Sequence, residues 1–376
     1  MQVRPTRAEI DLDALAHNLA VVRTSAPAAR ILAVVKADAY GHGLLPVARR
    51  LAAEGIDGFG VALVEEGLAL RDAGIDVPIL VLNGIYDGAH AQTLRAGLTP
   101  VVYDLSDVEA FHAAAGPDAP ADVHLKVDTG MSRLGVPWRR IDAFLDGLER
   151  FDRVRIRGLM THLSSAEDDP EATSEQLTRF EGVRARLRAR GHAPRTIHAA
   201  NSAATLLRGE ARFDMVRAGV VLYGVRPGPE VDAALRPVMR IVTSVARVTT
   251  VEPGTAVGYA RTWRAARSSR IATLAIGYGD GFMRHLSNRG EVLIRGRRCP
   301  IVGLVSMDLT GVDVTELDGC ERGEEAVVLG VQGDERLTAE QVGAAAGTIG
   351  YEVLCSIAPR VPRVYRGEGA PAGGRG

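Results

Sequence analysis

The chain has 376 residues, 46% of them apolar and 24% charged, which is typical of a globular protein with room for two domains. Its 45 basic and 46 acidic side chains nearly balance, which argues against binding to nucleic acid or to a membrane and favours small-molecule partners. The three cysteines, Cys299, Cys320 and Cys355, have neither the spacing of a metal site nor that of a disulfide framework, and they fit a cytoplasmic location.

The first predicted element is an amphipathic helix after Asp11, a good N-cap residue, because apolar residues recur at helical spacing from Leu12 to Val22. Eight apolar, β-branched runs follow, separated by helix-like polar stretches such as residues 171–190. The runs cover residues 31–37, 58–63, 77–83, 98–103, 122–129, 154–163, 195–202 and 213–224. Strands that are apolar throughout are buried on both faces, so eight βα units predict an α/β fold, a closed (β/α)8 TIM-type barrel. An open doubly wound sheet is the alternative.

A change in composition near Pro237 predicts a second domain. The segments after it are rich in Val, Thr, Ile and turn glycines and show few helical patterns, which indicates a mostly-β domain. We therefore expect a barrel over residues 1–236, a β domain over residues 237–366 and a flexible Gly-, Pro- and Arg-rich tail over residues 367–376. The charged N-terminus and the lack of a long apolar run lead us to expect no signal peptide and no membrane span.

Only two of the 45 basic residues are lysines, Lys36 and Lys126. Arginine replaces lysine as a solvated cation or as a carboxylate partner, but it cannot lose its proton to become a nucleophilic amine. Each remaining lysine is therefore a candidate for amine chemistry, with loss of the other lysines by drift as the alternative. Both lie where predicted barrel strands end, which is where barrels of this type carry their active sites. Other candidate residues at such positions are Arg133, His162, Asn201, Ser202, Arg217 and Gly219.

Six segments resemble the signature segments of alanine racemases: AVVKADAYGHG, KVDTGMSRLG, RAGVVLYG, GYGDG, SMD and YEVLCSIAPRVPRVY. The resemblance covers nearly the whole chain and both predicted domains. It implies a fold-type III pyridoxal phosphate enzyme that interconverts L-alanine and D-alanine and supplies D-alanine for peptidoglycan. It also implies a head-to-tail homodimer, and it allows roughly residues 1–10 to join the β domain.

The resemblance places pyridoxal 5′-phosphate in an aldimine with Lys36, a role that an amine can fill and a guanidinium cannot. It assigns further cofactor contacts to Tyr40, Arg133, His162, Asn201, Ser202, Arg217, Gly219, Val220 and Tyr351. Ser202 begins a predicted helix whose N-terminal amides favour an anion, and Gly219 allows a close backbone approach. Arg217 matches the arginine that donates to the pyridine nitrogen, which would leave that nitrogen unprotonated and weaken the ring as an electron sink. A salt bridge at the barrel rim is the alternative role for Arg217.

Racemisation removes a proton from one face of Cα and delivers another to the opposite face, so two acid–base groups must flank the substrate. Lys36 is one, and the resemblance assigns the other to Tyr259, reaching in from the partner subunit. The ordinary pKa of tyrosine, near 10, is too high for a base at neutral pH, so a hydrogen-bonding or cationic neighbour is required. His162 beside Arg217 is the candidate, with a purely structural histidine as the alternative.

The resemblance assigns the substrate carboxylate to Arg133 and to the backbone amide of Met307. Asp308 is expected to shape the same loop, and Tyr278 in GYGDG matches an entrance residue. The GYGDG segment lacks the spacing of a phosphate-binding loop, so we expect a turn there. Lys126 matches a lysine that is often carbamylated and then orients the arginine equivalent to Arg133; a simple salt bridge is its alternative. No metal site is expected.

Two residues depart from the family pattern: Ser306 stands where cysteine is frequent, and Ala260 stands where glycine is frequent. Both lie near the expected substrate loop, so a broader alanine and serine specificity is one alternative, because one methylene in an apolar pocket contributes only about 1–3 kcal/mol. A fold-type III amino-acid decarboxylase is a second alternative, although Arg217 and the lack of a glycine triplet argue against it. A non-catalytic pyridoxal phosphate carrier is a third, although such carriers lack the β domain.

Overall fold

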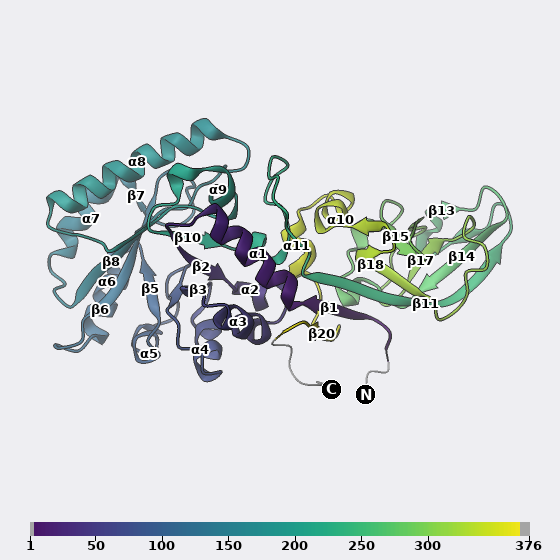
Figure 1. The fold of residues 1–376 in the computed structure, drawn as a ribbon, viewed down its shortest axis with the longest axis horizontal. Helices are drawn as coiled ribbons and strands as arrows, with labels where there is room; N and C mark the ends of the chain where they lie inside the picture. The colour runs from purple at the N-terminus through teal and green to yellow at the C-terminus, as the bar shows by residue number, and fades with distance from the viewer. Residues whose placement is uncertain (1–3, 369–376) are drawn as a thin grey trace.

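The computed structural model describes residues 4–368 and consists of a barrel and an elongated β domain, which lie at opposite ends of the molecule in Figure 1. The chain passes from the barrel into the β domain along the segment before β11 (Met239–Val251). Of the tail predicted at 367–376, all but Gly367 and Glu368 lies outside the described residues.

Eight parallel strands form the barrel in the order β10-β2-β3-β4-β5-β6-β8-β9. Their bounds are β2 (Arg30–Val34), β3 (Gly58–Val61), β4 (Ile79–Val81), β5 (Thr99–Val102), β6 (Ala121–Asp128), β8 (Val154–Met160), β9 (Thr196–His198) and β10 (Met215–Ala218). Backbone hydrogen bonds from Asp214 to Ile197 and from Arg217 to Ala200, both 3.0 Å, connect the two outer strands and close the ring. Each strand coincides with one of the eight predicted runs, although β2 and β6 begin one residue earlier, so the TIM-type barrel is confirmed and the open sheet is not found.

Helices cover the outside of the barrel (Figure 1), and the first begins where the sequence predicts, because the Asp11 carboxylate accepts hydrogen bonds from the amides of Asp13 and Ala14. These helices are α1 (Leu12–Ser25), α3 (Leu44–Ala53), α4 (Val64–Asp72), α5 (His90–Arg95), α6 (Leu105–Ala114), α7 (Ile141–Leu148), α8 (Pro170–Ala189) and α9 (Ser202–Leu207). The short element α2 (Lys36–Tyr40) has left-handed backbone angles and lies at the cavity. A short strand β7 (Val136–Pro137) pairs with β6. A small apolar cluster packs separately from the main core, and it consists of Leu32, Leu80, Val101, Met160 and Met215.

The second sheet has the path β16-β15-β18-β11-β1-β20, with β14 and β17 attached to β11 and β19 attached to β18. Its strands are β1 (Arg7–Asp11), β11, β14 (Ser269–Leu274), β15 (Glu291–Ile294), β16 (Arg297–Pro300), β17 (Thr310–Asp313), β18 (Glu325–Gln332), β19 (Glu335–Leu337) and β20 (Arg363–Arg366). The N-terminal strand β1 pairs antiparallel with β11 and parallel with β20, so both ends of the described chain belong to this sheet. Two helices, α10 (Ala339–Ala346) and α11 (Gly350–Cys355), complete this part.

A separate hairpin, β12 (Ala256–Val257) paired with β13 (Trp263–Arg264), forms a two-stranded sheet of its own. Its tip is a single 3-10 turn, η4 (Tyr259–Arg261). Further 3-10 turns are η1 (Trp138–Arg140), η2 (Gly209–Ala211), η3 (Val220–Tyr223), η5 (Tyr278–Asp280) and η6 (Arg284–Leu286). Within residues 4–368, no helix combines the length and the apolar character needed to cross a membrane.

Candidate active site

A cavity of about 460 Å³ lies where the barrel strands end, and α11 of the β domain forms part of its wall. The predicted site residues that line it are Lys36, Tyr40, Lys126, Arg133, His162, Asn201, Ser202, Arg217, Gly219, Val220 and Tyr351. Most of them come from barrel segments far apart in the sequence, whereas Tyr351 comes from the C-terminal part of the same chain. The structure therefore brings both lysines, two arginines and the expected hydroxyl groups together in one space.

Lys36 is held at this cavity by an unusual backbone conformation. The next four residues, Ala37 to Tyr40, have φ values of 53° to 54° and form a left-handed turn, which costs roughly 1–2 kcal/mol per residue for side chains other than glycine. Neighbours stabilise the turn: Glu66 accepts a 2.7 Å hydrogen bond from the Ala37 amide, and the buried His42 ring donates from Nδ1 to the carbonyls of residues 39 and 40. Strain of this kind is concentrated at functional sites in proteins.

Both lysines have lowered pKa values. Burial, followed by the positive charge of Arg133, lowers the pKa of Lys36. Burial and the charges of Arg217 and Arg133 lower the pKa of Lys126 to about 8. No ion pair joins Lys126 to a carboxylate anywhere in residues 4–368, so the simple salt bridge left open by the sequence is not found. Each lysine is thus more readily available as a neutral amine than a solvated lysine would be.

Arg217 is almost completely buried and uses both terminal nitrogens within the barrel. Nη1 donates to Nδ1 of His198 (3.0 Å) and to its carbonyl (3.1 Å), while Nη2 donates to the carbonyls of Thr161 (2.7 Å) and Ala199 (2.8 Å) and to Nδ1 of His162 (3.2 Å). None of the described carboxylates forms an ion pair with Arg217, so the alternative of a rim salt bridge is wrong. Burial lowers its pKa to about 10, and the guanidinium therefore keeps its proton at neutral pH.

The donor character of Arg217 fixes the tautomers of two histidines. Because a guanidinium can only donate, Nδ1 of His162 and Nδ1 of His198 must accept, and each ring therefore carries its hydrogen on Nε2. In His198 that hydrogen is donated to Nδ1 of His124 at 2.8 Å. Burial, together with Arg217 and the other nearby cations, lowers the pKa of His162 well below 6.5. His162 is consequently a neutral ring with one N–H group left to donate.

The other end of the cavity has the features of an anion cradle. The amide of Gly219 donates to Oγ of Ser202 at 2.9 Å, and a Cβ atom at Gly219 would lie only 2.7 Å from Oη of Tyr40. Burial raises the pKa of Tyr40, and it raises that of Tyr351 to about 12, so both phenols keep their protons. Two phenol hydroxyls, one serine hydroxyl and backbone amides can serve a phosphate group, and a side chain at position 219 would collide with one of those hydroxyls, that of Tyr40.

The remaining predicted residues lie outside the cavity, on the surface of the β domain. Tyr259, at the tip of the β12–β13 hairpin, is 72% exposed, Met307 is 53% exposed and Tyr278 is 42% exposed. Asp308 follows Met307 and is also exposed. A single chain therefore holds one part of the predicted site in the barrel and the other part on a separate surface.

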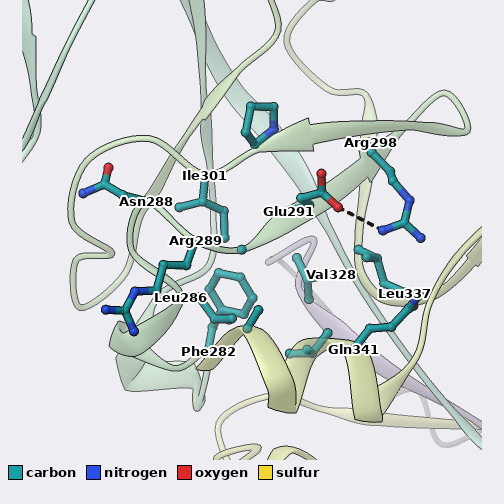
Figure 2. A pocket seen from close by; sticks show the side chains of 14 residues that line it. Phe282, Leu286, Asn288, Arg289, Glu291, Arg298, Ile301, Val328, Leu337 and Gln341 are labelled. Atoms are coloured by element: carbon teal, nitrogen blue, oxygen red, sulfur yellow. Dashed lines mark hydrogen bonds and ion pairs between the residues drawn. The ribbon is translucent and has the colours of Figure 1, made fainter. Parts of the chain in front are cut away.

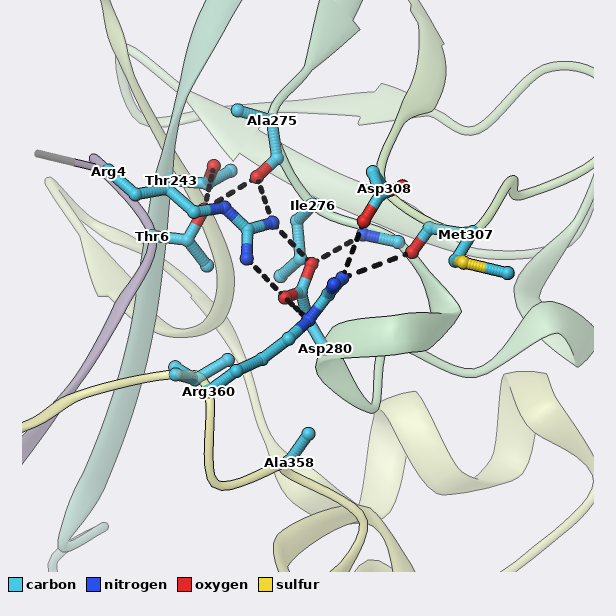
Figure 3. A network of polar contacts seen from close by, with 12 residues as sticks. Arg4, Thr6, Thr243, Ala275, Ile276, Asp280, Met307, Asp308, Ala358 and Arg360 are labelled. Atoms are coloured by element: carbon cyan, nitrogen blue, oxygen red, sulfur yellow. Dashed lines mark hydrogen bonds and ion pairs between the residues drawn. The ribbon is translucent and has the colours of Figure 1, made fainter.

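The turn GYGDG and the Met307 segment are joined by backbone and side-chain contacts (Figure 3). The amides of Tyr278 and Gly279 donate to the carbonyls of Ser306 (2.9 Å) and Met307 (2.8 Å). The buried Asp280 carboxylate accepts from the Gly277 amide and from two guanidinium groups, those of Arg4 and Arg360, and Arg360 also donates to Asp308 at 2.8 Å. Burial alone would raise the pKa of Asp280, but these hydrogen bonds lower it below its ordinary value. The GYGDG segment therefore forms a turn, as the sequence predicts.

Sequence reasoning missed Cys355, which lines the cavity, and Tyr223, which packs against Tyr40. Tyr223 is fully buried, donates from its hydroxyl to the Val34 carbonyl at 3.0 Å and packs its ring 4.8 Å from that of Tyr40. Its position in RAGVVLYG was the only available signal. Cys355 lines the cavity near Lys36, although the cysteine spacing by itself indicated no function.

A parallel barrel with amine groups at its mouth, joined to a β domain that closes one side of the cavity, defines a two-domain barrel enzyme. Residues 10–227 match the family described as "Alanine racemase, N-terminal domain", and residues 238–365 match "Alanine racemase, C-terminal domain". The chain belongs to the alanine racemase family, whose members are isomerases. The match of residues 238–365 also argues against the single-barrel carrier.

Individual relatives agree over their full lengths. The chain is 46% identical to an alanine racemase of Sorangium cellulosum, over 97% of this chain and 100% of that protein. It is 43% identical to one of Geobacter sulfurreducens, over 97% and 98%. The solved alanine racemase from Streptomyces coelicolor A3(2) is 38% identical with a TM-score of 0.89, over 97% of this chain and 99% of that one. The one from Bacillus anthracis is 33% identical with a TM-score of 0.91, over 98% and 97%.

Proposed function

We propose that this protein is a cytoplasmic, pyridoxal 5′-phosphate-dependent alanine racemase that supplies D-alanine for peptidoglycan and acts as a homodimer. The observation that carries the proposal is the half-buried amine of Lys36 in one cavity with the buried guanidinium of Arg217 and the hydroxyl cradle at Gly219. Two relatives named alanine racemase, which match this chain over 98–100% of their own length, support the proposal.

The residues present fit the cofactor. When bound, pyridoxal phosphate supplies an aldehyde for a primary amine and a conjugated ring that takes up the electrons left on Cα after proton loss. Lys36 offers an amine with a lowered pKa for that aldehyde. The phosphate would be held by the hydroxyls of Tyr40, Ser202 and Tyr351 and by the amide of Val220, beside Gly219, whose own amide donates to Oγ of Ser202. Asn201 caps α9 through the Ala204 amide and so positions Ser202.

Arg217 would face the pyridine nitrogen. Its terminal nitrogens are fixed by carbonyl groups and two histidines, and its Nε donates to no residue among those described. Because its pKa of about 10 keeps the guanidinium protonated, it acts only as a donor toward that nitrogen. A ring nitrogen held without a proton is a weaker electron sink, which disfavours side reactions such as transamination.

Lys36 and Tyr259 would act as the two acid–base groups, one on each face of Cα. Tyr259 does not line the cavity of its own chain and is exposed, so in this mechanism it must act in the barrel of another copy. We therefore infer that Tyr259, Met307 and Tyr278 complete the barrel site of a second copy. The Nε2–H group of His162 would then donate to the phenol oxygen and lower its pKa.

Arg133 and the amide of Met307 would hold the substrate carboxylate. We infer that Lys126 is carbamylated, since carbon dioxide adds to a neutral amine and the pKa of about 8 leaves part of Lys126 neutral at physiological pH. The carbamate would give Arg133 an anionic neighbour in a cavity that is otherwise rich in cations. Intact mass measurement, with and without mild acid treatment that removes carbon dioxide, tests this step.

The decisive experiment is incubation of the purified holoenzyme with L-alanine in deuterated water. We expect D-alanine to form together with deuterium incorporation at Cα. Release of carbon dioxide from an amino acid would support a decarboxylase instead, and bound cofactor without any turnover would support a carrier. The same assay with L-serine measures whether the Ser306 and Ala260 departures broaden the specificity.

A further inference from the structure

The hairpin that carries Tyr259 has few fixed connections to the rest of the β domain. Among residues 4–368, strands β12 and β13 pair only with each other and do not extend the large sheet. Backbone ladder hydrogen bonds therefore cannot set the position of Tyr259 relative to Met307, which lies on another segment. Contacts of individual residues must do so.

The hairpin and the segment that leads to Met307 approach each other at two glycines. Gly303 has φ +75°, and a Cβ atom there would lie 2.6 Å from the carbonyl oxygen of Val257 in β12. Gly258, which precedes Tyr259, lies beside Leu304 at a looser distance, since a Cβ atom there would lie 3.4 Å from the Leu304 amide nitrogen. This contact brings the two backbones close together, but van der Waals contacts are less directional than hydrogen bonds and specify the orientation of the hairpin tip less closely.

One side chain connects the two segments by hydrogen bonds. Asn288 donates from Nδ2 to Oγ1 of Thr262 in the hairpin at 3.1 Å, and its Oδ1 accepts the amide of Gly303 at 2.7 Å. Its neighbour Ser287 accepts the amide of Val305 at 2.9 Å. Asn288 itself has φ +58°, a left-handed conformation that asparagine tolerates better than most residues.

Asn288 lies at the edge of a cavity of about 210 Å³ in the β domain (Figure 2). Leu286, Ile301 and Phe282 line that cavity and belong to the buried core, and the amides of Arg289 and Gly290 donate to the Leu286 carbonyl. The segment that carries Asn288 is therefore anchored to the core of the β domain, and the Asn288 side chain connects it to the hairpin.

We propose that Asn288 is a positioning residue, which fixes the Tyr259 hairpin against the Met307 segment through its bonds to Thr262 and Gly303. This inference rests on the proposed function, in which Tyr259 and Met307 act together on one substrate in the partner's barrel. The single amide group sets the distance between the phenol and the carboxylate-binding amide.

The test measures the loss of the α proton from L-alanine and from D-alanine separately, in deuterated water, with the holoenzyme. In the proposed mechanism Tyr259 removes the proton of one enantiomer and Lys36 that of the other. A displaced hairpin should therefore change the ratio of the two initial rates. A fault in folding or cofactor loading would lower both rates alike.

Two substitutions remove the bond from opposite sides. Thr262→Val removes the acceptor, and Asn288→Gly removes both hydrogen bonds while tolerating the positive φ. We expect each to shift the ratio against the Tyr259-dependent enantiomer by about three- to tenfold, the usual effect of one neutral hydrogen bond. Thr262→Ser should stay close to wild type. Asn288→Asp should also keep the wild-type ratio, because its carboxylate can accept hydrogen bonds from both the Gly303 amide and the Thr262 hydroxyl. Adding Thr262→Val to Asn288→Asp removes that hydroxyl and should shift the ratio.

Tyr259→Phe is the reference for the direction of the shift. If it changes the ratio and Thr262→Val and Asn288→Gly do not, or if they lower both rates equally, the positioning role of Asn288 is overturned while the proposed function stands. If Tyr259→Phe leaves the ratio unchanged, or if the wild-type protein does not racemise alanine, the proposed function is overturned and this inference with it.

Discussion

Nη2 of Arg217 donates to Nδ1 of His162 across 3.2 Å, and this contact decides which nitrogen of the histidine can act toward the cavity. Since Arg217 is only a donor, the His162 hydrogen must sit on Nε2. In the proposed site, Arg217 at the pyridine nitrogen is therefore hydrogen-bonded to His162, whose Nε2–H group faces the phenol of Tyr259.

The first prediction concerns His162→Asn. The asparagine Oδ1 can still accept from Arg217, but the outward N–H group is lost. We expect the cofactor absorption to stay unchanged and turnover to fall by about three- to tenfold, because one hydrogen bond to the phenol is removed. Since the pKa of His162 already lies well below 6.5, its titration should not contribute to the acid limb of the pH–rate profile. A variant whose acid limb differs from that of wild type near pH 6.5 would contradict this assignment.

The second prediction tests the phosphate cradle. Gly219→Ala should weaken pyridoxal phosphate binding, because the new Cβ would lie 2.7 Å from Oη of Tyr40. Tyr40→Phe removes that oxygen, so adding it to Gly219→Ala should cost less than the sum of the two single effects, with a coupling of about 1 kcal/mol. Titration of the apoprotein with the cofactor, followed by absorbance, measures all four affinities. Strictly additive losses would mean that the methyl group and the hydroxyl do not meet.

The third prediction separates the two lysines. Lys36→Arg keeps a positive charge in the cavity but has no amine, so it should lose the covalent cofactor absorption completely. Lys126→Arg should keep that absorption. Borohydride reduction followed by peptide mapping should place the pyridoxyl group on Lys36 in the wild-type protein. A pyridoxyl group found on Lys126 instead would reverse the roles.

Much of the fold could be predicted because its signals are local. Each barrel strand lies in its own apolar run, and the residues at the strand ends meet because parallel strands share one rim. The left-handed turn from Ala37 to Tyr40 could not be predicted, since local preference opposes it at every position. Contacts from outside the turn, such as those of Glu66 and His42, help to stabilise it.

Contacts between distant segments were also beyond local reasoning. The pairing of β1 with β11 and β20, the packing of Tyr223 on Tyr40 and the bond between Asn288 and Thr262 have no counterpart in any sequence period. The expected role of Tyr259 came from the family resemblance alone, and one chain places this residue in an exposed turn. For Ala260 the sequence did carry a signal, since alanine stands where the family often has glycine. The structure shows the physical reason for that preference, because Ala260 has a left-handed φ of 56°.

The fourth prediction tests whether the site is shared between subunits. Lys36→Ala and Tyr259→Phe homodimers should each be nearly inactive. If Tyr259 acts in the partner's barrel, unfolding and reassembly of an equal mixture should restore roughly a quarter of the wild-type activity, because half of the dimers are mixed and each mixed dimer has one intact site. A mixture that remains as inactive as its components would show that both groups act within one chain.

The fifth prediction links His42 to stability. Nδ1 of His42 donates to two carbonyls of the left-handed turn, whereas Nε2 is buried and has no hydrogen-bond partner among the described residues. Burial lowers the pKa of His42 to about 4 from its ordinary value of 6.5. The unfolded chain therefore binds a proton between pH 6.5 and pH 4 that the folded protein does not, so this contribution is complete above pH 6.5 and is lost as the pH falls toward 4.

The corresponding variant is His42→Asn, whose side-chain amide can still donate to the turn but does not titrate. Between pH 7 and pH 5 the wild-type protein should lose about 2 kcal/mol more of its unfolding free energy than the variant, since one proton corresponds to about 1.4 kcal/mol per pH unit below pH 6.5. Urea unfolding of the holoenzyme at both pH values measures the difference, and His285→Asn at an exposed position should behave as wild type. An equal pH dependence in wild type and His42→Asn would mean that the folded protein protonates the His42 ring as readily as the unfolded chain does. The structure argues against this, because the second ring nitrogen, Nε2, is buried and has no acceptor among the described residues.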